Sequence, residues 1–348
     1  MSYIFYFILK QYCRIALWFY FKKWQVHFNS PLPNGPVIFV VNHQNAFLDA
    51  VLVSCSASRN PWFLARASVF NKGWVATILN RLKMLPVYRF RDGFKTLRKN
   101  DEMIMQYANL LTKGGSILIF AEGNHNERWN LRPLQKGFAR IALAAFDLHD
   151  VKIIPVGLQF DSHSQMGTRV LVNFGNPISV KESIQSEMDT RQKIEALLEK
   201  TKEGLEPLML NIDSIEYKKR VSHFLSTRII YSDLVQQLKS DQQLLHNYRP
   251  EDLYEAKEQN KKRLDLISLY GLLTIYLAKT ITASILKKKM KDPQFAGSLK
   301  FALGIILIPL FFIIQSSAFY FITKSILITG IHFLSQPLAF LYYRNTKD

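Results

Sequence analysis

The chain has 348 residues, 48% of them apolar, a composition that excludes a disordered chain unable to bury a core. The 45 Lys and Arg against 27 Asp and Glu give a net charge of +18, so polyanions are the expected partners. The basic residues flank apolar and aromatic stretches without a nucleic-acid recognition signature, which favours a lipid membrane and no nucleic acid. Cys13 and Cys55 are too few for a disulfide framework or a zinc site.

Residues 1–30 are expected to form an amphipathic helix at a membrane interface. Their sequence begins MSYIFYFILKQYCRIALWFYFKKW and lacks the cleavage site of a signal peptide. At helical period, four polar residues fall within a sector of about 120° and leave a wide apolar face: Lys10, Gln11, Arg14 and Lys22. A helix of this kind lies in the interface, although a helix that packs on a folded domain can show the same pattern.

Residues 31–206 alternate strand and helix candidates, as α/β proteins do. The strands are expected at 36–41, 62–65, 84–88, 116–120, 151–159 and 169–174. The helices are expected at 46–57, 94–113, 134–148 and 187–206. Because the strand candidates are nearly continuous apolar runs, we predict a sheet that is covered by helices on both faces.

The C-terminal part is predicted to reach the membrane. Residues 207–298 read as a basic, mostly helical region, in which the apolar stretch 266–278 is too short to span a bilayer. Residues 299–348 contain two longer apolar stretches, 301–322 and 325–343, which predict a hydrophobic, transmembrane helical hairpin. Pro309 and Pro337 disturb an ideal span, so a re-entrant hairpin is the alternative. The basic residues on both sides of the hairpin place its flanks, and the catalytic domain, on the cytoplasmic face of the membrane: Lys287, Lys288, Lys289, Lys291, Arg344 and Lys347.

Four short blocks with unusual polar residues or glycine fall at or near the strands of the α/β region. They are NHQNAFLD at 42–49, LPVYRFRDG at 85–93, AEGNH at 121–125 and IIPVGLQF at 153–160. Together, over about residues 36–180, they resemble the lysophospholipid acyltransferase superfamily, which contains the 1-acylglycerol-3-phosphate and glycerol-3-phosphate acyltransferases. The resemblance implies an α/β fold with a mixed sheet flanked by helices, and an O-acyltransferase that uses acyl-CoA or acyl-ACP as co-substrate and no other cofactor.

The first block supplies the expected catalytic pair, His43 and Asp49. A neutral imidazole at His43 can take the proton of a glycerol hydroxyl as that oxygen attacks an acyl thioester, while Asp49 fixes the tautomer and stabilises the imidazolium. The family separates this His and Asp by four residues, whereas here five residues, QNAFL, stand between them. The contact between the two side chains therefore requires a differently shaped turn.

The second and third blocks supply the residues that the resemblance assigns to the substrate phosphate. These are Arg89, Glu122, Gly123 and Lys136. In the third block the small hydroxyl residue and the arginine of the family are replaced by Asn124 and His125, so Arg128, Arg132 or Lys136 is needed to restore the positive charge. Residues expected to support the site are Asn42, Asn124, His125 and Arg132. No metal site is expected, because no ligand spacing supports one.

The favoured function is acyl transfer to 1-acylglycerol-3-phosphate, which gives phosphatidate in phospholipid synthesis. Glycerol-3-phosphate or another lysolipid is the alternative acceptor. A non-catalytic, membrane-bound lipid-binding protein with the same fold is the alternative from another class, because of the extra residue after His43 and the missing arginine after Gly123. The expected partners are a lipid membrane, a lysophospholipid acceptor, and acyl-CoA or an acyl carrier protein.

Overall fold

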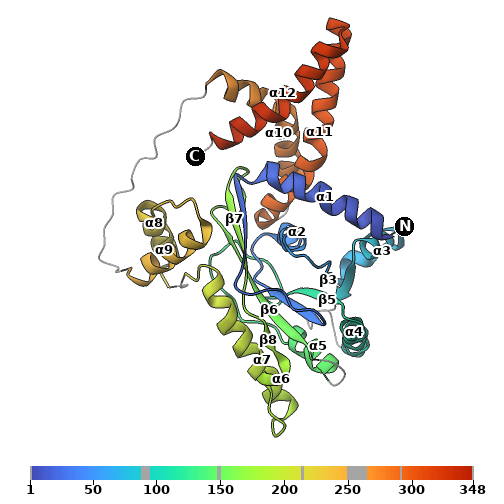
Figure 1. The fold of residues 1–348 in the computed structure, drawn as a ribbon, viewed down its shortest axis with the longest axis vertical. Coiled ribbons are helices and arrows are strands. Elements are labelled where there is room, and N and C mark those ends of the chain that lie inside the picture. Colours follow the sequence, from blue (N-terminus) through green and yellow to red (C-terminus); the bar gives the residue numbers. More distant parts are fainter. Residues whose placement is uncertain are drawn as a thin grey trace.

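The structure, a computed structural model, describes residues 2–87, 95–146, 150–212, 215–248, 265–290 and 292–346. Within these residues, eight strands form one mixed sheet in the order β1-β7-β6-β2-β5-β3-β4, with β8 beside β6 (Figure 1). The strands are β1 (Lys23–Phe28), β2 (Val37–Val41), β3 (Trp62–Arg66), β4 (Met84–Val87), β5 (Ser116–Phe120), β6 (Lys152–Phe160), β7 (Arg169–Phe174) and β8 (Ile178–Ser179). Strand β2 is parallel to both β5 and β6, whereas β6 is antiparallel to β7 and β8.

Helices cover both faces of the sheet, because its central strands are apolar on both faces. All five residues of β2 are buried, and its side chains alternate between two cores. Phe39 packs on the face covered by α1 and α2, while Ile38 packs on the face covered by α4, α5 and α7. These helices are α1 (Ser2–Tyr20), α2 (Ala46–Ser56), α4 (Lys95–Thr112), α5 (Gly137–Phe146) and α7 (Thr190–Leu205). The predicted α/β fold, a mixed sheet flanked by helices, is confirmed.

The N-terminal segment is only partly helical, in contrast to the helix expected over residues 1–30. Helix α1 ends at Tyr20, and β1 follows as an edge strand paired in parallel with β7. The ring of Phe28 stacks on that of Phe174 at 4.5 Å, so cross-strand packing decides the conformation of this segment. Helix α1 packs on α2 through Leu17, and it keeps large apolar residues such as Ile4 and Trp18 exposed.

Four short elements were not predicted, two of them between β3 and β4 and two after β7. The structure has a short 3-10 helix η1 (Ala67–Phe70), helix α3 (Gly73–Arg81), helix α6 (Val180–Ser183) and strand β8, none of which was expected. Helix α3 has only nine residues and none of them is buried, so it is too short to give a strong helical pattern in the sequence.

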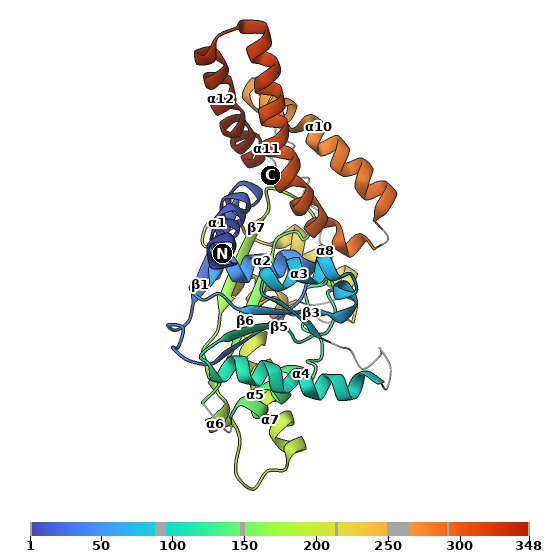
Figure 2. The same cartoon turned by 90° about the vertical axis from the view of Figure 1, so that its right-hand side faces the viewer.

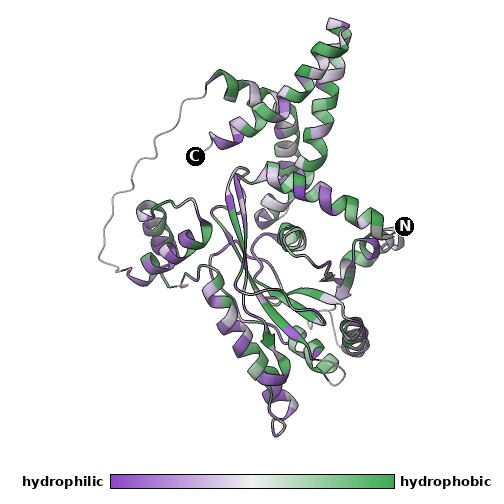
Figure 3. Ribbon diagram, in the orientation of Figure 1, coloured by the Kyte–Doolittle hydropathy of each residue, from purple (hydrophilic) through white to green (hydrophobic). Residues whose placement is uncertain are grey.

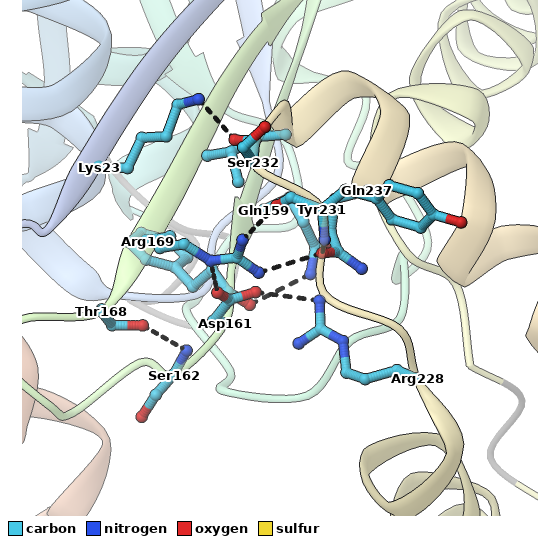
Figure 4. A network of polar contacts seen from close by, with 12 residues as sticks. Lys23, Gln159, Asp161, Ser162, Thr168, Arg169, Arg228, Tyr231, Ser232 and Gln237 are labelled. Carbon is cyan, nitrogen blue, oxygen red and sulfur yellow. Dashed lines mark hydrogen bonds and ion pairs between the residues drawn. The ribbon is translucent and has the colours of Figure 1, made fainter. Parts of the chain in front are cut away.

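Helices α8 (Tyr217–Thr227) and α9 (Leu234–His246) form a small unit beside β7 and β1, after the 3-10 helix η3 (Glu206–Leu208). A polar network joins this unit to the sheet (Figure 4). Arg228 lies between two carboxylates, with Asp161 at 3.1 Å and Asp241 at 2.6 Å, and Arg169 of β7 pairs with Asp161 at 2.5 Å. Because Arg228 and Asp241 are buried, the loss of either partner would leave an unpaired buried charge.

Three apolar helices rise from one end of the domain: α10 (Leu266–Lys289), α11 (Ala296–Thr323) and α12 (Ile326–Asn345), with the 3-10 helix η4 (Pro293–Phe295) between the first two (Figure 3). By length and composition alone, each of the three is able to cross a membrane. The predicted helical hairpin is thus present as α11 and α12. Arg344 near the end of α12 donates to the carbonyl oxygen of Phe21 at 2.9 Å, which ties the hairpin to the end of α1.

Helix α10 corrects the expectation that its apolar stretch is too short to span. The helix continues beyond Ala278 to Lys289 and has 24 residues, because the Lys and Thr residues that follow are tolerated in a helix despite their polarity. Figure 2 shows α10 inclined to the hairpin. Its first end is held by a hydrogen bond from Tyr342 of α12 to Asp265, and its second end leads through η4 to α11.

Candidate active site

The turn after β2 is fastened to the sheet by Asn42. This fully buried side chain donates to the carbonyl oxygen of Leu158 at 3.0 Å and accepts from the backbone N–H of Leu158 at 2.7 Å. The amide group thereby replaces a backbone pairing between the end of β2 and β6 at the point where β2 stops. His43 follows directly, so its backbone leaves the sheet at a defined position.

His43 and Asp49 are in contact, despite the extra residue between them. His43 Nδ1 lies 2.9 Å from Asp49 Oδ2, and the same oxygen accepts from the backbone N–H groups of Gln44 at 2.9 Å and Asn45 at 2.7 Å. The carboxylate is fully buried, whereas the His43 side chain is 14% exposed. The longer turn is accommodated at Ala46, whose φ of +43° lies in the left-handed region that a residue with a Cβ rarely adopts.

The start of α11 closes this turn from the opposite side. Ser298, which is fully buried, donates through Oγ to the carbonyl oxygen of Asn45 at 2.5 Å and accepts from the N–H of Leu48 at 3.0 Å. Beside it, Gly297 packs so closely that an added Cβ would lie 2.1 Å from the carbonyl oxygen of His163. The hairpin is therefore in direct contact with the turn that holds His43, which the sequence did not indicate.

Aromatic rings hold the His43 imidazole in place. The ring stacks on Phe120, the last residue of β5, with centroids 3.9 Å apart and planes within 13°. His125 lies 5.5 Å from the His43 ring and packs on Phe295 of η4 at 4.3 Å. Burial lowers the pKa of His125, and the neighbouring His43 acts in the same direction, so the neutral form of His125 is favoured.

The third block forms a charged pair at the end of β5. Glu122 accepts from Arg132 Nε at 2.6 Å, and Arg132 also reaches the side chain and the backbone of Asn124. Burial raises the pKa of Glu122 to about 7, against the opposing effect of Arg132. Arg132 thus brings a positive charge to the loop in which the family arginine is missing. Gly123 has a φ of +79°, which suits a residue without a Cβ.

The structure does not test the phosphate-binding role assigned to Lys136 and Arg89. Lys136 is exposed and stands directly before α5, one residue after Gln135, whose N–H donates to Ala121 at 2.7 Å. Arg89 lies outside the described residues, so its role stays a prediction. The other predicted residues lie together at the carboxyl ends of β2 and β5: Asn42, His43, Asp49, Glu122, Gly123, Asn124, His125 and Arg132.

Sequence reasoning missed several residues of this region. They are Gln44, Asn45, Phe120, His163, Phe295, Gly297 and Ser298. His163 is buried, and it contacts Gln44 through Nε2 at 3.1 Å and accepts from Asn45 Nδ2 through its carbonyl oxygen at 2.6 Å. Gln44 and Asn45 lie within the first block and Phe120 directly before the third, whereas no local signal in the sequence marks the others.

The fold and this edge of the sheet define an α/β protein with a carboxylate-oriented histidine at a strand end and apolar helices attached. Residues 23–159 match a family model described as Acyltransferase. This part of the chain is therefore a domain of the acyltransferase family.

Curated relatives carry related names. The glycerol-3-phosphate O-acyltransferase 1 of Saccharomyces cerevisiae is 30% identical over 113 residues, 30% of this chain and 15% of that protein. The chloroplastic 1-acyl-sn-glycerol-3-phosphate acyltransferase BAT2 of Brassica napus is 26% identical over 153 residues, 44% of this chain and 41% of that protein. The chain thus spans less than half the length of these relatives. The crystal structure of the 1-acyl-sn-glycerophosphate acyltransferase PlsC from Thermotoga maritima aligns with a TM-score of 0.39 and 16% identity, over 57% of this chain and 78% of that one.

Proposed function

We propose that this protein is an O-acyltransferase that moves a fatty acyl group from acyl-CoA or acyl-ACP to the hydroxyl of 1-acylglycerol-3-phosphate, giving phosphatidate. The observation that carries the proposal is the contact of 2.9 Å between His43 Nδ1 and the buried Asp49 carboxylate at the end of β2. The family match over residues 23–159 and the names of the relatives support the reaction class.

In the proposed reaction His43 is the general base. Because Nδ1 donates to Asp49, the lone pair of the neutral ring is on Nε2, which takes the proton of the acceptor hydroxyl. The hydroxyl oxygen attacks the thioester carbonyl, the resulting tetrahedral intermediate expels the thiolate, and the imidazolium returns the proton to the sulfur. The Asp49 carboxylate stabilises the imidazolium while it exists.

Direct transfer without an acyl-enzyme fits the two cysteines. Burial raises the pKa of Cys13, and it raises the pKa of Cys55 to about 12, so both thiols stay protonated near neutral pH. A protonated, buried thiol is a poor nucleophile.

The acceptor and the membrane setting belong to the same proposal. Glycerol-3-phosphate is the second candidate acceptor, because the yeast relative carries that substrate in its name. The exposed apolar residues of α1 and the three apolar helices support a membrane-bound enzyme, with the catalytic domain on the cytoplasmic face beside Lys287, Lys288, Lys289 and Arg344. Arg89 and Lys136 are proposed to meet the acceptor phosphate.

The test is thiol release by the full chain in detergent micelles, with acyl-CoA and acyl-ACP as donors and lysophosphatidate and glycerol-3-phosphate as separate acceptors. His43→Ala is expected to lower turnover by about 10² to 10⁴. His246→Ala is the matched control, because this exposed residue ends α9 and lies in the separate α8–α9 unit. Acceptor-dependent turnover that survives His43→Ala contradicts the assigned base. A folded wild type without turnover in every combination supports the non-catalytic, lipid-binding alternative.

A further inference from the structure

A large apolar cavity lies between the amphipathic helix and the three apolar helices. Its volume is about 940 Å³, at the upper end of the roughly 300 to 1,000 Å³ that small-molecule sites occupy. Residues from α1, α10, α11 and α12 line it, and small side chains on three of these helices leave the space open: Ala16, Ala278, Ala283 and Gly304. The remaining lining is mostly aliphatic and aromatic, which suits a hydrocarbon chain.

Polar groups border the cavity where it meets the catalytic domain. Ser164 and Gln165 belong to the loop that follows β6, and Lys300 of α11 donates to the carbonyl oxygen of Ser164 at 2.8 Å. The residue before Ser164 is His163, whose carbonyl oxygen accepts from Asn45.

Two contacts connect this border of the cavity to the turn that holds His43. Ser298 stands two residues before Lys300 and is bonded to the backbone of the turn. Lys300 also lies within electrostatic range of Glu127, two residues after His125. A chain in the cavity thus has its polar end beside the region that holds the proposed base.

We propose that this cavity holds the hydrocarbon chain of a lipid substrate, with the polar end of that substrate at Ser164 and Lys300 beside the catalytic turn. The proposal rests on the proposed function and adds the site for the chain. Because lipid tails are as apolar as the cavity walls, moving a chain from the bilayer into the cavity gains little hydrophobic free energy. The cavity is therefore expected to affect which chain lengths the protein accepts, because a hydrocarbon chain longer than the cavity would collide with its walls.

The occupant is either the acyl chain of the donor or that of the acceptor, and the test has one arm for each. Gly304→Leu narrows the cavity without disturbing the backbone, because an added Cβ would meet only Ile308 Cδ1, at the ordinary contact distance of 3.7 Å. Gly330→Leu is the matched control, since a Cβ at this glycine of α12 has no neighbour within 4 Å and the residue does not line the cavity. Ala283→Leu on α10 is a second filling variant, in case Gly304→Leu fails to fold.

In the first arm, octanoyl, myristoyl and oleoyl thioesters are compared on oleoyl lysophosphatidate; in the second, octanoyl and oleoyl lysophosphatidate are compared with one donor. The filling variants are expected to lower the ratio of long-chain to short-chain turnover by about tenfold or more in one arm, as a mismatch of a methylene or more in a pocket does. The arm that responds identifies the chain. Unchanged ratios in both arms, in a folded filling variant, overturn the proposal, as does an equal change in Gly330→Leu.

A binding experiment tests the chain site independently of turnover, so it distinguishes a wrong chain site from a wrong proposed function. Wild-type protein is labelled with an oleoyl lysophosphatidate and an oleoyl-CoA that carry a photoreactive diazirine in the chain. Labelling of α10 or α11 at cavity residues, lost in Gly304→Leu and kept in Gly330→Leu, supports the chain site even for a protein without turnover. Labelling that is confined to the outer, bilayer-facing residues overturns it.

Discussion

The contact between the hairpin and the catalytic turn gives the sharpest prediction, for Ser298→Ala. The change removes a hydrogen bond to the carbonyl oxygen of Asn45 and another from the N–H of Leu48. At about 0.5 to 1.5 kcal/mol each, the two bonds contribute about 1 to 3 kcal/mol. The left-handed conformation of Ala46 costs about 1 to 2 kcal/mol, so the two bonds are of the size needed to hold the turn in it.

Without Ser298 the turn is expected to relax away from the geometry that brings His43 to Asp49. A loss of 1 to 3 kcal/mol from that geometry corresponds to a fall in kcat of roughly 5- to 150-fold. The assay is thiol release at saturating donor and acceptor, with thermal unfolding measured on the same detergent-solubilised sample. Ala46→Gly placed in Ser298→Ala should restore part of the rate, because glycine adopts the positive φ without the cost of a Cβ.

Ser316→Ala is the matched control for Ser298→Ala. Ser316 is also a buried serine of α11, and its Oγ accepts from Gln336 Nε2 at 2.8 Å within the hairpin. Its loss removes this one hydrogen bond, so it should lower stability by about 0.5 to 1.5 kcal/mol and leave kcat unchanged. Equal turnover in the two alanine variants would refute the idea that Ser298 positions the catalytic turn.

Three further predictions follow from the site and its supports. Asp49→Asn should lower kcat by about 10² to 10⁴, measured by thiol release, because an amide does not stabilise the imidazolium; near-normal turnover would remove Asp49 from the mechanism. Glu122→Gln should make the melting temperature depend less on pH. Burial raises the pKa of Glu122 from 4.5 to about 7, so the contribution of its protonated form to stability is full below about pH 4.5 and is lost as the pH rises through 7. A melting temperature that falls with pH as steeply as in the wild type would contradict this. Arg344→Leu should lower the melting temperature, because carbonyl oxygens at the end of α1, including that of Phe21, lose their donor at an expected cost of about 1 to 3 kcal/mol each, whereas Arg191→Ala, at an arginine with 81% of its side chain exposed, should have no measurable effect.

The parts of the fold that the sequence predicts well are those with a strong local signal. The central strands are short apolar runs bounded by Gly, Pro or Asn, and β2 and β5 appear within one residue of their expected ends. The alternation of strands and helices then leads to a sheet covered on both faces. The histidine and the acid of the first block were found in the same way, because both follow β2 within eight residues.

The parts that were missed depend on contacts between distant segments. Strand β1 directly follows a helix without Gly or Pro, and its partner β7 lies about 140 residues later, so no local pattern marks it. Ser298 and Phe295 stand before an apolar helix as ordinary residues, and only the docking of α11 brings them to His43 and His125. The five-residue spacing likewise shows no sign of the positive φ at Ala46.

The hydrogen bonds from Arg344 to the end of α1 have a consequence for how the enzyme meets its substrates. They join the amphipathic helix to the hairpin, and Ser298 joins the hairpin to the turn that holds His43, so direct contacts connect all three. Under the proposed function, a hairpin inserted in a bilayer sets the distance between the proposed base, His43, and the lipid surface. Turnover should therefore follow the mole fraction of lysolipid in the surface, and diluting that lipid with an inert detergent should slow the reaction at constant bulk concentration.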